Sequence, residues 1–241
     1  MGVFFNKIDR KQLKPGDHIY SWRKAYLYAH HGIYVGDGMV INFTSGAVQG
    51  KTRTPTILGS LITSSSSSSF YTDIPCPRCG DDGSQTRTHS VISSCLDCFL
   101  SGGKLRLYQY GVNKLHFIVQ ARGGTCTFAS SDPMEEVLHR AFYLLENGFG
   151  DYHVSKNNCE DFAIYCKTGL RVTAEDSSVG GSGQAASFKA GVKSAFWSAL
   201  PYVVSSSCCL TIYSGSYCYR RVVSDIGFRR NGTKVPVEKN I

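Results

Sequence analysis

Cys159 stands at a position that would suit a nucleophile. It follows Asn157 and Asn158, and the run that it opens is typical of the start of a helix. The first turn of a helix has unpaired backbone N–H groups and the positive end of the helix dipole, and both favour an anion. A thiolate is an anion, so this position predicts a lowered pKa for the Cys159 thiol. The same N–H groups would suit the oxyanion of an acyl-transfer reaction.

A nucleophilic thiol needs a base, and the adjacent residues His30 and His31 are candidates. Both lie in a run of aromatic and β-branched residues that predicts a strand, and residues 36–38 (Gly-Asp-Gly) predict a hairpin turn after it. Asn42 lies on the returning strand, where its side chain is expected to fix the tautomer of the imidazole. Spacing alone leaves open that Cys159 is a small buried residue and that the histidines belong to the core or the surface.

Four cysteines form a second group, with the spacing C-x2-C-x15-C-x2-C. This spacing is typical of zinc ribbons, in which each pair directs two thiolates to one tetrahedral ion. Four thiolates close the coordination sphere, so the pattern predicts a structural Zn²⁺ site and not a catalytic one. Four reduced cysteines packed without metal are the alternative, and His89 is a weaker candidate ligand. The predicted ligands are Cys76, Cys79, Cys95 and Cys98.

The strands and helices that the sequence predicts around these residues indicate an α+β fold, with an antiparallel sheet packed on helices. Residues 13–43 are rich in strand signals, and further strands are expected within 104–120. One helix is expected from Pro133 to Gly148 and a second from Asn157 to Gly169. The expected organisation is a domain at 13–170 with the four-cysteine insert at 76–98, a linker at 171–193, an apolar segment at 194–219 and a basic tail at 220–241.

Composition narrows the class of protein. The 241 residues carry a formal net charge of +8, but the basic residues are scattered and no nucleic-acid-binding motif is present, so no nucleic-acid partner is expected. Charges at Lys7, Asp9 and Arg10 argue against a signal peptide. An intracellular, cytoplasmic location is therefore expected, with the ten cysteines kept reduced.

The ends of the chain carry weaker membrane signals. Residues 194–219 lack a formal charge and are long enough to cross a bilayer, but Pro201, Gly215 and several hydroxyl residues dilute the segment. Two interpretations stay open: a segment that spans or anchors to a membrane, or a helix that packs on the domain. Basic residues on both sides suit a lipid surface with anionic headgroups, which is the expected partner. The start Met1-Gly2 half-matches a myristoylation signal.

Three runs of the sequence resemble the LRAT-domain family, a circularly permuted branch of the NlpC/P60 papain-like thiol hydrolases. They are PGDHIYSW, HHGIYVGDG and NNCEDFAIY, and the resemblance covers roughly residues 13–170, with plant NC-domain proteins the most similar group. The resemblance implies that His30 is the base and Cys159 the nucleophile. The third family residue is usually a histidine, whereas this chain has Asn42. It also implies a thioester acyl-enzyme formed from a lipid acyl donor, with no cofactor for catalysis.

Three functions are compatible with these features. The first is a membrane-associated thiol acyltransferase or lipid acyl hydrolase. The second is a catalytically weak scaffold of the same fold, which binds partners through the zinc insert and a basic surface. The third is a peptidase or amidase like the more distant NlpC/P60 relatives.

Overall fold

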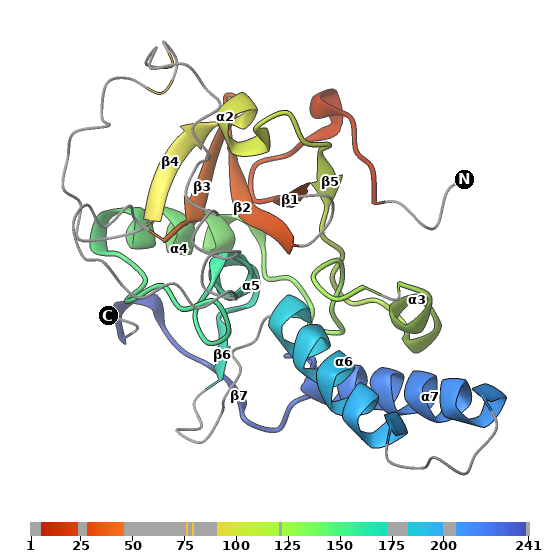
Figure 1. Cartoon of the computed structure of the whole chain (residues 1–241). Coiled ribbons are helices and arrows are strands. Elements are labelled where there is room, and N and C mark those ends of the chain that lie inside the picture. Colours follow the sequence, from red (N-terminus) through yellow and green to blue (C-terminus); the bar gives the residue numbers. More distant parts are fainter. Residues whose placement is uncertain are drawn as a thin grey trace, which may run out of the picture.

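A five-stranded antiparallel sheet organises the protein (Figure 1). The computed structural model describes residues 6–23, 28–45, 76, 79, 91–120, 122–172, 183–199 and 206–239. The sheet has the order β4-β3-β2-β1-β5. Its strands are β1 (His18–Arg23), β2 (Tyr28–Gly36), β3 (Met39–Phe43), β4 (Val91–Cys95) and β5 (Arg106–Leu107).

The hairpin of β2 and β3 forms where the sequence predicts it. Asp37 has a φ of 50° and Gly38 a φ of 72°, a left-handed conformation that glycine adopts without strain. Gly32 lies opposite Asn42 in the register of the two strands. Because side chains alternate along a strand, His30 and Gly32 point to one face of the sheet and His31 points to the other.

Helices cover both faces of the sheet (Figure 1). On one face, α4 (Met134–Asn147) and α5 (Cys159–Thr168) pack against β2 and β3 through a core that includes Ile33, Phe43 and Phe162. On the other face, the short helix α2 (Leu96–Leu100) packs Phe99 and its neighbours against Val40. The structure is therefore a mixed α+β fold with an antiparallel sheet, as expected.

The two long helices of the domain begin and end as the sequence predicts. Asn158 caps α5 through its side-chain oxygen, and Asp161 returns a hydrogen bond to the Asn158 N–H at 3.1 Å. Gly169 ends α5 in the left-handed conformation, and Gly148 ends α4. These caps fix the direction in which Cys159 enters the first turn of α5.

The described residues after 170 form helices and strands, which corrects the expected linker and tail over 183–199 and 206–239. Within the supposed linker 171–193, β6 (Leu170–Val172) pairs with β7 (Gly232–Lys234), and α6 (Gly183–Ala199) begins. The supposed tail contains the end of α7 (Ser206–Ser224), then β7 and the 3-10 turn η3 (Val237–Lys239). Its Val237 is buried in the main core. Figure 1 shows α6 and α7 side by side as a helical hairpin beneath the domain.

The prediction of a strand at residues 117–119 is also wrong, because these residues belong to the helix α3 (Lys114–Val119). Asn113 caps it by accepting a hydrogen bond from the His116 N–H at 2.8 Å. Only Phe117 of its apolar run is buried, whereas Ile118 and Val119 are exposed. The remaining short element is the 3-10 turn η1 (Arg10–Gln12).

None of the helices in the described parts of the chain combines the length and apolar character that crossing a membrane requires.

Candidate active site

Cys159 lies beside residues 29–31 of β2, where this strand extends beyond its pairing with β3. Its thiol lies 3.8 Å from the carbonyl oxygen of Ala29, and its sulfur accepts a hydrogen bond from the backbone N–H of His31. The Tyr152 hydroxyl donates a further hydrogen bond to the sulfur. The Cys159 sulfur is thus held by one carbonyl and two donors, and only 5% of the residue is exposed.

The thiol pKa moves in the direction opposite to the one predicted. Burial raises the pKa of the Cys159 thiol to about 12, and the nearby charges of Glu160 and Asp161 also raise it. The hydrogen bonds from His31 and Tyr152 favour the thiolate but do not offset the loss of solvation. The position of Cys159 at the helix N-terminus does not lower its thiol pKa, because burying the thiolate charge costs more free energy than the helix terminus returns.

Two of the first-turn amides of α5 are already occupied. The N–H groups of Glu160 and Asp161 donate to the Asn158 side-chain oxygen at 2.8 and 3.2 Å. They are not free to receive an oxyanion, as the sequence had suggested, while this cap is in place. Two other donors, the His31 N–H and the Tyr152 hydroxyl, already point to the sulfur.

The structure brings His30 and Asn42 together. The Asn42 amide nitrogen lies 2.9 Å from His30 Nε2, and Ser94 Oγ donates to the Asn42 amide oxygen at 3.3 Å. The His30 ring packs against Phe99 of α2, with centroids 5.2 Å apart. Burial, Arg23 and His31 lower the pKa of His30 to about 3, so the ring is neutral near pH 7.

The orientation of the Asn42 amide decides which nitrogen of His30 carries the proton. In the arrangement described, the amide N–H donates to Nε2, so the proton of the neutral ring is on Nδ1. A half-turn of the amide would let its oxygen accept an N–H from Nε2, and the Ser94 hydroxyl would then accept from the amide. Only that second arrangement leaves Nδ1 as a proton acceptor.

His31 occupies the opposite face of β2 and has both ring nitrogens engaged. Its Nδ1 lies 2.8 Å from His18 Nε2, and its Nε2 lies 2.9 Å from the Gln184 amide nitrogen. The other nitrogen of His18 contacts the Tyr110 hydroxyl at 2.7 Å. His31 and His18 are fully buried, and burial lowers the pKa of both.

Two residues that sequence reasoning missed, Glu160 and Gln184, connect α6 to the site. The Glu160 carboxylate accepts hydrogen bonds at 2.9 Å from the backbone N–H groups of Gly183 and Gln184, the first residues of α6. The Gln184 side chain accepts from the Ala29 N–H at 2.6 Å and donates to the Ala29 carbonyl at 3.0 Å. Because these partners are more than 20 residues apart, no local signal marked them.

No hydrogen bond joins the His30 ring to the Cys159 thiol among the described residues. The thiol contacts backbone groups of residues 29 and 31, which flank His30 in β2. The His30 ring points to the face that α2 covers. The structure therefore brings His30 and Asn42 together and sets Cys159 against the backbone beside His30, and the pairing of His30 with Cys159 stays a prediction.

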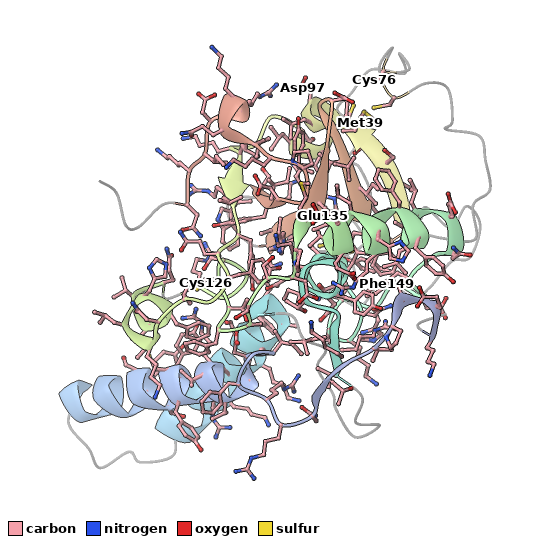
Figure 2. The ribbon with its side chains drawn as sticks, turned by 180° about the vertical axis from the view of Figure 1, so that it is seen from behind. Met39, Cys76, Asp97, Cys126, Glu135 and Phe149 are labelled. Carbon is pink, nitrogen blue, oxygen red and sulfur yellow. The ribbon has the colours of Figure 1, made fainter. Side chains whose placement is uncertain are left out.

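The four cysteines of the insert converge at the far end of β3 and β4. Their sulfur atoms all lie within 4.8 Å of one another, and the Cys76 and Cys95 sulfurs are 3.8 Å apart. Tetrahedral zinc with Zn–S bonds of about 2.3 Å requires sulfur atoms about 3.8 Å apart, so this donor set fits zinc. Figure 2 shows Cys76 at the same end of the molecule as Met39 and Asp97, away from Cys126 and from the α6–α7 hairpin.

Backbone N–H groups support this cluster and connect it to the sheet. The N–H of Cys95 donates to the Cys79 sulfur at 3.2 Å, and that of Cys98 donates to the Cys95 sulfur at 3.5 Å. Cys95 ends β4 and also caps α2. The cluster is thus continuous with Ser94 and Phe99, the residues that contact Asn42 and His30.

Comparison with known proteins agrees with the resemblance of the three sequence runs. The family model described as Lecithin retinol acyltransferase matches residues 11–172. The chain is 50% identical to Protein LEAD-SENSITIVE 1 of Arabidopsis thaliana over 244 residues, which cover 99% of this chain and 90% of that protein. No solved structure matches. The family match contains the sheet, α4, α5, and both Cys159 and the His30–Asn42 pair, and the chain therefore belongs to the lecithin retinol acyltransferase (LRAT) family.

Proposed function

We propose that this protein is a cysteine-dependent acyltransferase or acyl hydrolase that acts on membrane lipids through a thioester at Cys159. Membership of the LRAT family supports acyl transfer as the reaction class. The single observation that carries the proposal is the meeting of Cys159 with the residues on either side of His30. In chain order the base precedes the nucleophile, as in a permuted NlpC/P60 papain-like fold.

Of the two adjacent histidines, His30 is the better base. Both nitrogens of His31 are hydrogen bonded, so this ring cannot take a proton without breaking a contact. Of the two ring nitrogens of His30, only Nε2 has a hydrogen-bond partner among the described residues, so Nδ1 is the nitrogen left to accept the thiol proton. The Asn42 amide must present its oxygen to Nε2 for this role, which keeps the proton off Nδ1.

The raised pKa of Cys159 implies that the thiolate forms only as the reaction proceeds. His30 takes the thiol proton while the sulfur attacks the acyl carbonyl carbon, and the C–S bond forms as the carbonyl π bond opens to an oxyanion. The alkoxide leaving group departs with the proton from His30, which leaves a thioester. Water or an acceptor amine or hydroxyl then attacks the thioester, with its proton passing through His30, and the thiol is restored.

Intact-protein mass spectrometry after incubation with phospholipid vesicles tests this proposal. Wild-type protein is expected to gain the mass of an acyl chain, and hydroxylamine is expected to remove it. Cys159→Ala should show no gain, whereas Cys166→Ala, which removes a buried cysteine of the same helix, should behave as wild type. A folded wild-type protein that gains no mass and turns over no lipid would refute a phospholipid donor.

We also propose that the four-cysteine cluster binds one structural Zn²⁺. The ligands would be Cys76, Cys79, Cys95 and Cys98, whose sulfur positions fit tetrahedral coordination. The ion would brace β4 and α2, and through them the His30–Asn42 contact. Metal analysis should find one zinc per chain, and the Cys76→Ser, Cys79→Ser double variant should lose it. A Cys126→Ser, Cys166→Ser double variant, which keeps the cluster, should retain zinc.

A binding or scaffold protein is the second candidate. Two observations favour it: the raised pKa of Cys159, and an Asn42 amide that donates to His30 instead of accepting from it. Alkylation by iodoacetamide separates the two functions when it is followed with and without lipid vesicles. An enzyme should show Cys159 alkylation that lipid blocks by forming the thioester, whereas a scaffold should show slow alkylation that lipid leaves unchanged.

A further inference from the structure

A groove of about 500 Å³ lies between the α6–α7 hairpin and the edge of the domain. This volume is within the range of about 300–1,000 Å³ that sites for small ligands occupy. It lies largely outside residues 11–172, so the family match assigns it no role. Its lining includes the aromatic and apolar side chains Trp22, Phe188, Val192, Tyr213 and Tyr217, together with Arg122.

One end of the groove lies near the thiol site. Gln184 lines the groove, and its amide donates to the Ala29 carbonyl, which lies 3.8 Å from the Cys159 sulfur. The Gln184 amide and the Ala29 carbonyl thus lie between the groove and the nucleophile.

This same end is polar. Gly123 and Gly124 pack directly against the first turn of α6, so closely that a Cβ on either would clash with residues of that turn. This contact holds Arg122 beside Gln184, and its guanidinium lies 4.4 Å from the centroid of the Trp22 ring. The cationic Arg122 therefore lies at the end of the groove where an acyl carbonyl or an anionic head group would need to lie, whereas the N–H groups of the Gln184 amide already donate to the Ala29 carbonyl and to His31 Nε2.

The other end of the groove is apolar and open. Val192 lies eight residues after Gln184, which is about 12 Å farther along a helix that rises about 1.5 Å per residue. Phe188 is 66% exposed and Val192 is 57% exposed, so these two side chains form an apolar patch on one face of α6 that faces solvent. Lys189 and Lys193 flank these residues, and loss of solvation together with the nearby charges of Lys193 and Arg229 lowers the pKa of Lys189.

We propose that this groove binds one acyl chain of an anionic amphiphile, with its anionic end at Arg122 and its tail along Phe188 and Val192. The inference rests on the proposed function only in naming that amphiphile as the acyl donor. A free fatty acid and an anionic phospholipid share this chemistry.

Quenching of Trp22 fluorescence by a brominated fatty acid tests the proposal. The protein is the full chain with Trp197→Phe, which leaves Trp22 as its one tryptophan, and Cys159→Ala, which prevents acylation. Dibromostearate at monomeric concentrations should quench at least half of the fluorescence and saturate. The methyl ester of dibromostearate, which lacks the negative charge, should bind at least fivefold more weakly.

Two glycines of the hairpin give a matched pair of variants. Gly191 lines the groove and has room for a Cβ, with the nearest atom, the Tyr213 hydroxyl oxygen, at 3.8 Å. Gly215 lies on α7, is exposed and has no atom within 4 Å of a Cβ. Gly191→Leu should fill the groove and weaken binding at least tenfold, whereas Gly215→Leu should leave binding unchanged.

The outcomes separate this proposal from the proposed function. No saturable quenching, or equal binding by the two glycine variants, would overturn the groove as a site for an acyl chain. Quenching by brominated anionic vesicles alone, unaffected by Gly191→Leu, would overturn it in favour of adsorption to a lipid surface. If the quenching is saturable but the protein with Cys159 intact gains no acyl mass, the groove would stand as a binding site and the thioester mechanism would be refuted.

Discussion

His30 and His31 are neighbours on β2, yet they have opposite surroundings. His31 lies on the α5 face, where His18 and Gln184 engage both of its nitrogens. His30 lies on the α2 face, where Asn42 engages one nitrogen. A fully bonded ring stabilises a fold but has no free atom for proton transfer, whereas a ring bonded on one side can be oriented and still react. His31 therefore stabilises the fold, whereas His30 is the candidate for proton transfer.

The largest expected effect is on catalysis at His30. His30→Ala should lower the rate of acylation about 1,000-fold, since general base catalysis contributes about 10²–10⁴. The rate of mass gain under single-turnover conditions measures it. A His30→Ala protein that acylates at the wild-type rate would remove His30 from the mechanism.

Substitution of His31 should lower the stability of the fold. His31→Leu leaves His18 and the Gln184 amide without their buried partner, so the free energy of unfolding should fall by about 2–4 kcal/mol. Urea denaturation at pH 7 measures the change. His139→Leu is the control, because the His139 side chain is 57% exposed and should change stability by less than about 0.5 kcal/mol. Equal effects of the two variants would contradict a structural role for His31.

Acid should destabilise the protein through its buried histidines. The pKa values of His30 and His31 are lowered to about 3 in the folded state, from 6.5 when exposed. The unfolded chain therefore binds more protons below pH 6.5, and stability falls as the pH decreases from about 6.5 towards 3. Each histidine contributes a slope of about 1.4 kcal/mol per pH unit within that range. Urea midpoints between pH 7 and 5 measure the slope, which should be shallower in His31→Leu.

The smallest effect concerns the tautomer of His30. Asn42→Asp places a carboxylate, which only accepts hydrogen bonds, against Nε2 and so keeps Nδ1 free. Acylation should become about tenfold faster if the amide orientation limits the wild type, because about 1.4 kcal/mol corresponds to that factor. Asn42→Ala should be slower than wild type. A slower Asn42→Asp protein would show that the wild-type amide already presents its oxygen.

Sequence patterns predicted the elements whose signals are local. The hairpin at 36–38 and the caps Asn158 and Gly169 depend on residues a few positions apart, and the structure confirms them. The four cysteines also converge as their spacing predicts.

The errors involve contacts between distant residues. The Gly- and Ser-rich composition before residue 187 indicated a linker, but Glu160 caps α6 from 23 residues away. The apolar residues Phe117 to Val119 indicated a strand, although a single turn capped by Asn113 puts two of the three in solvent. The pKa of Cys159 depends on how deeply α5 is buried, which its first turn does not encode.

The bond between Gln184 and Ala29 joins residues 155 positions apart, and this separation has a kinetic consequence. During synthesis the sheet and α5 emerge from the ribosome well before α6, so the nascent domain lacks the hydrogen bonds that Gln184 makes with Ala29 and that Glu160 accepts from the first turn of α6. Contacts of such long range form late in folding. The first turn of α6 is consequently expected to dock only after β2 and α5 have formed the surface that receives it.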